Sequence, residues 1–467
     1  MRSGLEKYAS ARHRPQGRGY GLAFACFHWN DLIGYVLRRR VTAVKILVVG
    51  SGGREHTLAW KLSQSPRVER IYCAPGNAGT GELGENVAIP ATDLPALVRF
   101  AKENQIGLTV IGPDDPLAAG IVDLFETEGL RVFGPSKSAA RLESSKIFAK
   151  ELMRKNKIPT ARGAAFSKCE AAFAFVEEAR FPLVIKADGL ALGKGVIIVQ
   201  DGSGARAAID GMMTKLRFGD AGTRLLIEEC LTGSECSLHA LVDGKSHRML
   251  ATARDYKRAY DEDEGPNTGG MGAFSPADNF GAELQAQFER EVMRPLLQGL
   301  NESGVVFRGL LFPGLMITPG GPRILEFNCR FGDPETQVIL PRLKSDLLEL
   351  LEATIDGTLD KKVIEWDERA AVTVVLTSGG YPDKYDIGKP IDGLELLARA
   401  KDVHVFYAGA RKKKNGTILT SGGRVLAVTA LGKDVATARA RAYEAVSQID
   451  FEGCHYRRDI ALGAVAS

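Results

Sequence analysis

The stretch LEFNCRFGDPE, residues 325–335, combines the alternation of a β-strand, a turn and three polar side chains that suit a cation site. Alternate side chains of a strand share a face, so we expect Glu326, Asn328 and Arg330 to project together. The opposite face would be made by Leu325, Phe327 and Cys329. A hard cation such as Mg²⁺ takes few ligands from protein, and one carboxylate with one amide oxygen fits that preference. The alternative is an edge strand with a solvated polar face, which shows the same alternation.

Length and composition indicate a multidomain globular protein. The chain has 467 residues, enough for about three or four domains. Its 52 glycines against 3 tryptophans favour tight turns and backbone-lined sites over a surface that stacks bases. The 7 cysteines form no CxxC pair, which favours reduced thiols in a cytosol-like compartment. No run of about 18 apolar residues occurs, so we expect no membrane span.

The net charge of +4 is concentrated at the N-terminus. Residues 1–44 hold eight Lys and Arg against two acidic residues, a net of +6, so the rest of the chain carries −2. A nearly neutral body argues against nucleic-acid binding. Residues 1–43 form a basic extension without fold-like periodicity. It could be a targeting peptide for an organelle, a disordered arm or sequence read from a start site too far upstream, and we favour the last.

A compact domain begins at Val44, where VKILVVG predicts a buried strand. The turn Ser51-Gly52-Gly53-Arg54-Glu55-His56 follows and opens an amphipathic helix from Thr57 to Ser63. Such a turn directs backbone N–H groups at an anion. A nicotinamide-dependent oxidoreductase would need a small third residue where Glu55 stands, so a sugar phosphate is the better candidate. A purely connecting turn is the alternative.

Three further apolar runs, IYCAP, LTVIGP and VFGPS, each end in a turn and predict an open parallel α/β domain over residues 44–146. Ligands of such sheets lie at the carboxyl ends of the strands, where Asn77 also falls.

A second unit contains FPLVIKADGLALGKGVIIV, in which Lys186 and Lys194 flank a glycine-rich bend between two strand-like runs. Lysines beside a glycine bend suit a triphosphate, although a hairpin with surface lysines would look similar. In LLIEECLTGSECS, a strand is expected to pass into a connector that carries Glu228, Glu229 and Glu235. The segment from Ala253 to Pro276 lacks apolar periodicity, and we expect a functional loop there.

Five motifs in this order, GSGGREH, PGNAGT, KADGLALGKGV, GPNTGGMGA and LEFNCRFGDPETQ, resemble the glycinamide ribonucleotide synthetase family of the ATP-grasp superfamily. The resemblance runs from Val44 nearly to the C-terminus. It implies an α/β and α+β multidomain fold: an open parallel N-terminal domain (44–146), an ATP-grasp body (147–369) with a mobile lid at about 168–228, and a small α+β C-terminal domain (370–467). The strands AVTVVLTSGG and GRVLAVTALG, with a helix from Asp434 to Gln448, agree with that last domain.

The resemblance also implies the activity: ATP-dependent ligation of glycine to 5-phosphoribosylamine through glycyl phosphate, in purine synthesis. Catalysis would consist of holding reactants in line and neutralising developing charge. The implied metal ligands for Mg²⁺ or Mn²⁺ are Glu326 and Asn328. The implied catalytic residues are Arg330, Asp255 and Lys257. The implied ATP-binding residues are Lys146, Lys186, Gly193, Lys194, Gly195, Glu228, Glu229, Leu231 and Glu235. The implied substrate-binding residues are Gly52, Gly53, Arg54, Glu55, Asn77, Asn267, Gly269, Gly270 and Met271.

The sequence departs from the family pattern at a few positions. Arg254 and Tyr256 replace an amide and an imidazole, so no role carries over to them. Asp114 stands where the family has Glu, and Ser234 replaces an acid before Glu235. Another ATP-grasp ligase would share the ATP residues but should lack GPNTGGMGA. We expect a cytoplasmic monomer or weak homodimer that binds neither nucleic acid nor membrane.

Overall fold

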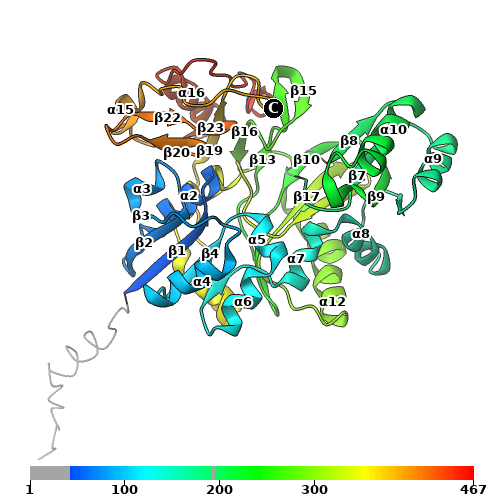
Figure 1. Ribbon diagram of the computed structural model, residues 1–467, viewed down its shortest axis with the longest axis horizontal. Helices are drawn as coiled ribbons and strands as arrows, with labels where there is room; N and C mark the ends of the chain where they lie inside the picture. Colours follow the sequence, from blue (N-terminus) through cyan, green and yellow to red (C-terminus); the bar gives the residue numbers. More distant parts are fainter. Residues whose placement is uncertain (1–42, 192–194, 467) are drawn as a thin grey trace, which may run out of the picture. The chain divides into compact units, whose positions relative to one another are not determined.

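The computed structural model describes residues 43–191 and 195–466, so the basic extension up to residue 42 lies outside the described residues. The first sheet is parallel throughout, in the order β3-β2-β1-β4-β5 (Figure 1). Its strands are β1 (Val44–Gly50), β2 (Val68–Pro75), β3 (Glu85–Asn86), β4 (Leu108–Ile111) and β5 (Val132–Phe133). Its helices are α2 (Gly53–Leu62), α3 (Thr80–Leu83), α4 (Leu94–Glu103), α5 (Asp114–Ala119) and α6 (Ile121–Thr127).

Strand β1 is apolar and buried from Ile46 to Val49 because both faces of the sheet are covered there. Ile46 and Val48 pack into one buried cluster, while Leu47 and Val49 pack into another. Helix α2 begins at Gly53, four residues before the expected Thr57. The Glu55 carboxylate accepts the Gly52 N–H at 2.6 Å, which caps the helix there.

Two helices, α7 (Lys137–Ser144) and α8 (Lys146–Lys155), lead to a second sheet in the order β6-β9-β7-β8. Its strands are β6 (Gly163–Phe166), β7 (Leu183–Ala187), β8 (Val196–Val199) and β9 (Leu225–Glu229), with α9 (Cys169–Glu178) and α10 (Gly202–Ile209) packed on one face (Figure 1). Strands β7 and β8 pair antiparallel, as the two runs around the glycine bend predicted. Residues 192–194, including Gly193 and Lys194, lie outside the described residues.

The third sheet is antiparallel, in the order β10-β17-β11-β12, and β18 pairs with β17. Its strands are β10 (Ser234–Ser237), β11 (Ala240–Asp243), β12 (His247–Met249), β17 (Arg308–Thr318) and β18 (Gly321–Asn328). The neighbouring helices are α11 (Ala282–Phe288), α12 (Arg294–Glu302), α13 (Thr336–Ile339) and α14 (Leu347–Asp356). Glu229 therefore ends β9 and Glu235 lies in β10, so the expectation that these acids belong to a connector was wrong.

Strand β18 departs from strict alternation. Ile324 pairs with Leu315 and Glu326 with Gly314, which leaves Leu325 unpaired in a bulge. Phe327 and Cys329 are buried in the core as expected, but Ile324 takes the core position that alternation assigned to Leu325. The expected orientation of Leu325 was wrong because the bulge shifts the register.

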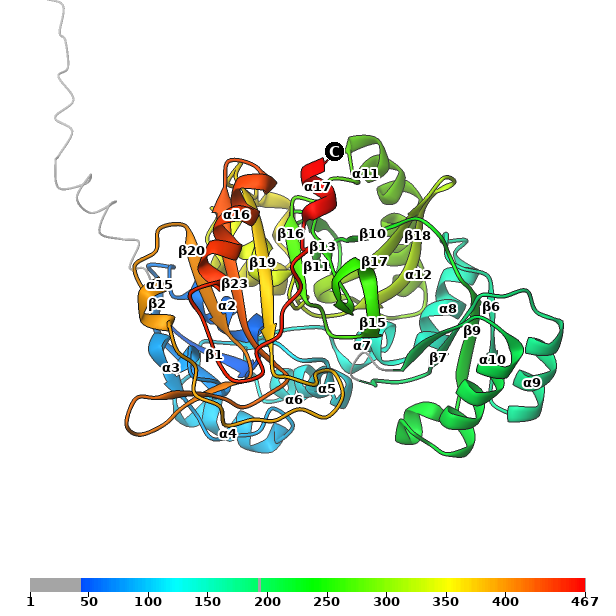
Figure 2. The ribbon, with the colours of Figure 1, turned by 90° about the horizontal axis from the view of Figure 1, so that it is seen from above.

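The last sheet joins distant parts of the chain in the order β13-β16-β19-β23-β20 (Figure 2). Its strands are β13 (Arg254–Asp255), β16 (Gly272–Ser275), β19 (Ala370–Thr377), β20 (Val403–Tyr407) and β23 (Arg424–Gly432), and α16 (Val435–Val446) packs on it. The smaller elements are β14 (Arg258–Tyr260) with β15 (Glu264–Asn267), β21 (Ala410–Lys412) with β22 (Ile418–Thr420), α15 (Leu394–Leu397) and α17 (Leu462–Ala466).

The segment from Ala253 to Pro276 was expected to be a loop, but it contains β13, the β14–β15 hairpin and β16. These strands hold two to four residues each, too short for an apolar pattern to appear in the sequence. None of the helices within 43–191 and 195–466 has the length and apolar character needed to cross a membrane.

Candidate functional site

The end of β18 gathers charged side chains in a buried environment. Arg330 donates to Asn328 Oδ1 at 3.0 Å and forms an ion pair with Glu143 Oε1 at 3.0 Å. Burial lowers the pKa of Arg330, but Glu143 and Asp114 outweigh it and raise the pKa above its usual value. Arg330 is therefore a fixed positive charge beside the proposed metal ligands.

The Glu326 carboxylate is ionised. Burial raises the pKa of Glu326, but Lys257, Lys146 and Lys186 outweigh that effect and hold it below its usual value. Within the described residues the structure records no hydrogen bond or ion pair for this carboxylate. Its oxygens therefore face positive charges and are available to a ligand.

Lys257 is close enough to Glu326 for their charges to interact, and it makes an ion pair with Glu235 at 2.7 Å. Burial lowers the pKa of Lys257, but the carboxylates of Glu235, Asp255 and Glu326 raise it well above its usual value. Burial raises the pKa of Asp255, while Lys257 opposes that shift. The structure thus brings together Asp255 and Lys257 with Glu235 and Glu326, four residues that the sequence singled out.

A second buried carboxylate lies behind this group. Glu335 accepts the Ser237 hydroxyl at 3.1 Å, and burial raises the pKa of Glu335 to about 7, with Asp255 adding to the shift. His239 is fully buried nearby and stacks on Phe312 with ring centroids 4.2 Å apart. Neither residue was assigned a role from the sequence: His239 belongs to no motif, and nothing in the motif around Glu335 shows that its carboxyl group is buried.

The next group lies where the second sheet meets β18. Glu228 forms ion pairs with Lys186 at 2.6 Å and with Lys150, and Lys186 also donates to the Leu325 carbonyl at 2.9 Å. Burial lowers the pKa of Lys150, and Glu228 opposes that shift. Glu228 is 3% exposed, so it is a buried ion-pair centre and not the solvated acid that a strand end suggests. Lys150 was not among the nucleotide-binding residues expected from the sequence, because it lies in α8 and belongs to no glycine motif.

Other expected nucleotide residues make local contacts. Lys146 donates to the Gly189 carbonyl at 3.2 Å, and Glu229 accepts the Arg162 N–H at 2.9 Å. Gly195 lies at the described edge of the β7–β8 hairpin, where its N-terminal neighbours are outside the described residues. Leu231 lies in the connector between β9 and β10, and its carbonyl accepts a weak contact from the Cys230 thiol at 3.9 Å.

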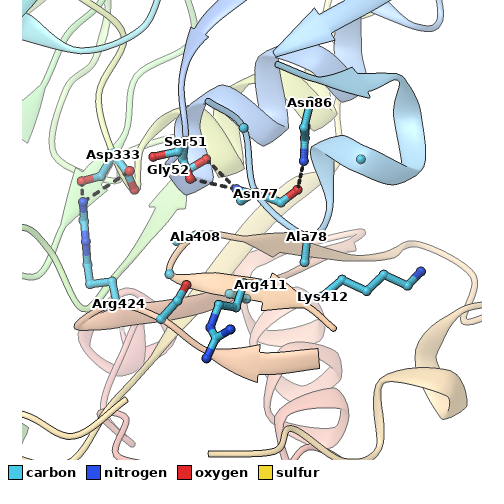
Figure 3. A pocket seen from close by; sticks show the side chains of 16 residues that line it. Ser51, Gly52, Asn77, Ala78, Asn86, Asp333, Ala408, Arg411, Lys412 and Arg424 are labelled. Carbon is cyan, nitrogen blue, oxygen red and sulfur yellow. Dashed lines mark hydrogen bonds and ion pairs between the residues drawn. The ribbon is translucent and has the colours of Figure 1, made fainter. Parts of the chain in front are cut away.

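A pocket of about 640 Å³ opens between the turns after β1 and β2 on one side and β21, its neighbouring turns and the start of β23 on the other (Figure 3). Its lining includes Gly52 and Asn77 from the expected substrate turns. Arg411, Lys412 and Arg424 add three cations from the far end of the chain. The sequence motifs did not identify Arg411 and Lys412, because the stretch RKKKN reads as a solvated charge run.

Asp333 joins this pocket to the end of β18. Arg424 forms an ion pair with Asp333 Oδ2 at 3.2 Å and donates to the Asp333 carbonyl at 2.7 Å. Burial raises the pKa of Asp333, but Arg424 and Arg54 outweigh it and hold the pKa below its usual value. Arg54 donates to the Phe331 carbonyl at 3.2 Å, so the first glycine turn contacts the loop that follows Arg330.

Two of the expected substrate-binding side chains, those of Asn77 and Glu55, make their hydrogen bonds to other residues of the protein. Asn77 donates to the carbonyls of Ser51 and Tyr407 at 2.9 and 2.7 Å, and its Oδ1 accepts from Gly79. Glu55 accepts from Gly52 and from Arg54 at 2.6 Å. These contacts shape the pocket wall. Among the pocket's cations, Arg424 pairs with Asp333 and Lys412 pairs with Glu82 at 3.4 Å, whereas the described residues show no ion pair for Arg411.

The GPNTGGMGA segment runs from β15 into β16. Gly269 accepts from Arg424 at 2.6 Å, and Gly270 packs against Pro334 with φ +115°, a conformation that favours glycine. Asn267 is partly exposed in the hairpin, whereas Met271 is fully buried. The segment therefore reaches the loop after β18 through its glycines, while Met271 faces the core.

Three family models match the chain. The phosphoribosylglycinamide synthetase N domain matches residues 44–143, its ATP-grasp (A) domain matches 144–336, and its C domain matches 371–463. Among similar proteins, phosphoribosylamine--glycine ligase of Caldanaerobacter subterraneus is 50% identical over 90% of this chain and 100% of its own length. The ligase of that name from Allochromatium vinosum is 51% identical over 91% of this chain and 99% of its own length.

Solved structures resemble the same architecture. The crystal structure of phosphoribosylamine--glycine ligase from Thermotoga maritima is 35% identical, with a TM-score of 0.77 over 90% of this chain and 100% of that one. The biotin carboxylase domain of Hydrogenobacter thermophilus 2-oxoglutarate carboxylase has a TM-score of 0.70 over 88% of this chain and 91% of that one. At 15% identity it shares the fold alone. The multidomain fold with a parallel N-terminal sheet, an ATP-grasp body and a C-terminal domain is confirmed.

Proposed function

Since the chain belongs to the phosphoribosylglycinamide synthetase family, we propose that the residues at the end of β18 and in the adjacent pocket divide its reaction between them. The protein is an ATP-dependent carbon–nitrogen ligase of purine biosynthesis that joins glycine to 5-phosphoribosylamine. A glycine carboxylate oxygen takes the γ-phosphoryl group of ATP and ADP leaves. The amine then attacks the carbonyl carbon of glycyl phosphate, and phosphate leaves.

The nucleotide end of the site is assigned to the second sheet and its connector. Lys146, Lys186 and Lys194 would neutralise the phosphates, and the glycine bend with Gly193 and Gly195 would lie over the phosphate oxygens. The other contacts, to adenine and ribose, would come from Glu228, Glu229, Leu231 and Glu235. The Glu228 ion pairs support this division, because a buried carboxylate between two lysines fixes both ammonium groups in place. Glu235 is engaged by Lys257, so the pair would separate when Glu235 turns to a ribose hydroxyl.

Glu326 and Asn328 fit a divalent cation. Glu326 is an ionised carboxylate without a hydrogen-bond partner in the described part of the chain, and Asn328 Oδ1 keeps a lone pair beyond its bond to Arg330. One carboxylate and one amide oxygen are what Mg²⁺ or Mn²⁺ takes when phosphates and water supply the rest. A bound ion would withdraw charge from the phosphate oxygens during transfer.

Three side chains are assigned to the chemistry. Arg330 would stabilise the acyl phosphate and the tetrahedral oxyanion, since it keeps its charge in a buried setting. Lys257 would neutralise the phosphoryl group in transfer. Asp255 would take the proton that the amine releases as the amide forms, which its raised pKa favours.

The 640 Å³ pocket is assigned to 5-phosphoribosylamine. The Glu55 carboxylate already caps the N-terminus of α2, so the sugar phosphate would be attracted mainly by Arg411, and by Lys412 in competition with its exposed partner Glu82. Gly52, Gly53, Arg54 and Asn77 would shape the wall. Asn267, Gly269 and Gly270 would form the floor towards β18, and the buried Met271 would support that floor from the core side. The observation that carries this assignment is Asp333, which lies both in this pocket and three residues after Arg330.

The function is tested by measuring ADP release in the presence of Mg²⁺ and ATP. The two other substrates are glycine and phosphoribosylamine, the latter formed in situ from ribose 5-phosphate and ammonia. We expect ADP formation to require both substrates. Release that is unchanged when either is omitted would contradict the ligase reaction. Variants Arg330→Ala and Lys257→Ala then test the residue assignment, because each should lower kcat by about 100-fold or more.

Assembly and location are assigned from fewer observations. We infer a monomer or weak homodimer, which light scattering on the purified protein would test. A cytoplasmic location is supported by the six cysteines of the described part, all free thiols, since reducing compartments keep thiols unpaired.

A further inference from the structure

Arg457, near the end of the chain, is the largest fully buried side chain in the described residues, at 1% exposed. Its guanidinium makes a paired contact with Asp459, Nε to Oδ1 at 2.7 Å and Nη2 to Oδ2 at 2.6 Å. Nη1 donates to Asp263 Oδ1 at 2.7 Å and to the Arg258 carbonyl at 3.2 Å. A buried cation thus ties the C-terminal tail to the β14–β15 hairpin, and its charge is matched by two carboxylates.

The same guanidinium lies over the ring of Tyr256, 4.9 Å from the centroid. The Tyr256 hydroxyl accepts the Ala461 N–H at 3.0 Å, and its ring packs against the core of the last sheet. Tyr256 is therefore held by the tail at both its ring and its hydroxyl.

Tyr256 stands between Asp255 and Lys257 in the chain. Its backbone is fixed as well, because its N–H donates to Gly272 and its carbonyl accepts from Met271. Lys257 reaches the other way, to Glu235 at 2.7 Å. Because Tyr256 is anchored, the adjacent Lys257 is held in place, with its ammonium group among the carboxylates around Glu326.

More backbone contacts join the tail to the hairpin. Arg458 N–H donates to Asp261 at 2.7 Å, Glu262 N–H donates to Asp459 at 2.9 Å, and the His455 ring bonds the Ala259 carbonyl at 2.8 Å. The tail contacts the hairpin along its length, and Arg457 is the contact that reaches both the hairpin and Tyr256.

We propose that Arg457 is a positioning residue for the ligase reaction: through Tyr256 and Asp263 it holds the segment that carries Asp255 and Lys257. The proposal rests on the catalytic roles assigned to those two residues. The C-terminal tail, none of whose described residues is assigned to the nucleotide site, is thereby part of what aligns phosphoryl transfer.

The first test replaces Arg457 by Ala and by Lys. A displacement of Lys257 by about 1 Å would lower kcat on the order of 10–100-fold, with little change in the KM for phosphoribosylamine. Added guanidinium ion at millimolar concentration should restore part of the kcat of Arg457→Ala, and Arg457→Lys should retain more activity than Ala. The matched control is Arg439→Ala, because Arg439 donates to the Ile460 and Arg458 carbonyls of the same tail and makes no hydrogen bond or ion pair with the hairpin in the described residues.

A second pair of variants avoids the buried arginine in case its removal prevents folding. Asp263→Asn and Glu262→Gln each remove one exposed negative charge from the same turn, and both residues have positive φ. The Asp263 side chain contacts Arg457, whereas no side-chain contact of Glu262 is recorded in the described residues. We expect Asp263→Asn alone to lower kcat, by roughly two- to tenfold.

Two results would overturn the proposal. One is an unchanged kcat in Asp263→Asn together with a folded Arg457→Ala that keeps its kcat. The other is an equal loss in Arg439→Ala without guanidinium rescue of Arg457→Ala, which would mean a general stability effect. Lys257→Ala is measured in parallel. If the catalytic assignment of Lys257 is wrong, Lys257→Ala itself will retain activity; if only the proposal for Arg457 is wrong, Lys257→Ala will still lose activity.

Discussion

At the residue scale, His239 has unusual surroundings for a polar side chain. Both ring nitrogens are buried without a hydrogen-bond partner in the described part of the chain, while the ring stacks on Phe312 at an interplanar angle of 21°. Burial lowers the pKa of His239 to about 3, with Arg330 adding to the shift. The folded protein therefore holds this imidazole neutral at a pH where the unfolded chain would protonate it.

His239→Phe should make stability less dependent on acid. The pKa of His239 is lower in the folded state than its unfolded value of 6.5, so its contribution to stability is fully present above pH 6.5. As pH falls from 6.5 towards 3, the unfolded chain takes up a proton that the folded protein does not, and the free energy of unfolding decreases. Between pH 6.5 and pH 5 the wild type should lose about 2 kcal/mol that the variant keeps. His56, whose pKa burial also lowers to about 3, is present in both proteins and cancels in the difference.

Urea unfolding of the two proteins at pH 7 and pH 5 gives this difference directly. His239→Phe should also be at least as stable as the wild type at pH 7, since it removes two unpaired buried nitrogens. Parallel loss of stability in both proteins between the two pH values would contradict the prediction.

At the element scale, strand patterns predicted the fold better than they predicted side-chain partners. The apolar runs at β1, β19 and β23 are long enough for their type to be read from the sequence. The bulge at Leu325 could not be read, because it depends on the register with Gly314 in another strand. Glu228 could not be identified as a buried ion-pair centre, since Lys150 and Lys186 come from other elements.

Helix α8 offers a test of how the second sheet is held. Its N-cap, Ser145, accepts the Phe148 N–H at 3.2 Å and donates to Asp188 at 2.9 Å, just after β7. Ser145→Ala should lower the unfolding free energy by about 1 kcal/mol and also raise the KM for ATP, because Asp188 loses a contact next to the glycine bend.

Ser136→Ala is the matched control for Ser145→Ala. Ser136 caps α7 by accepting the Ala139 N–H, and its recorded side-chain contacts do not include the second sheet. Calorimetry should find destabilisation in both variants, whereas steady-state kinetics should find a raised KM for ATP in Ser145→Ala alone. Equal KM values in the two variants would show that the link to Asp188 has no part in nucleotide binding.

At the scale of the whole molecule, the pocket is assembled from parts that no single motif contains. The sequence predicted the glycine turns, and the structure adds Arg411 and Lys412 from β21. Their importance could not be predicted, because a run of basic residues in a surface hairpin is ordinarily solvated. What makes them part of a site is the packing of the last sheet beside the turns after β1 and β2.

Arg411→Ala and Lys412→Ala should each raise the KM for phosphoribosylamine by about tenfold, the loss of one charge-assisted phosphate contact. The KM for ATP should stay unchanged. Added salt should reduce the difference in KM for phosphoribosylamine between each variant and the wild type, because salt screens the charge that the variant lacks. Lys414→Ala is the control, since Lys414 lies in the turn of the same hairpin outside the pocket lining. A raised KM in the Lys414 variant, or none in the other two, would contradict the assignment of the phosphate.

The sheet that joins β13 and β16 to β19 has a consequence for how the chain is made. A ribosome releases β16 well before it has synthesised β19, so the nascent chain exposes an unpaired strand edge until translation is almost complete. A stalled or prematurely terminated polypeptide would keep that edge open. We therefore expect nonsense variants that end before Ala370 to be retained by chaperones or degraded, and not to accumulate as a shortened ATPase.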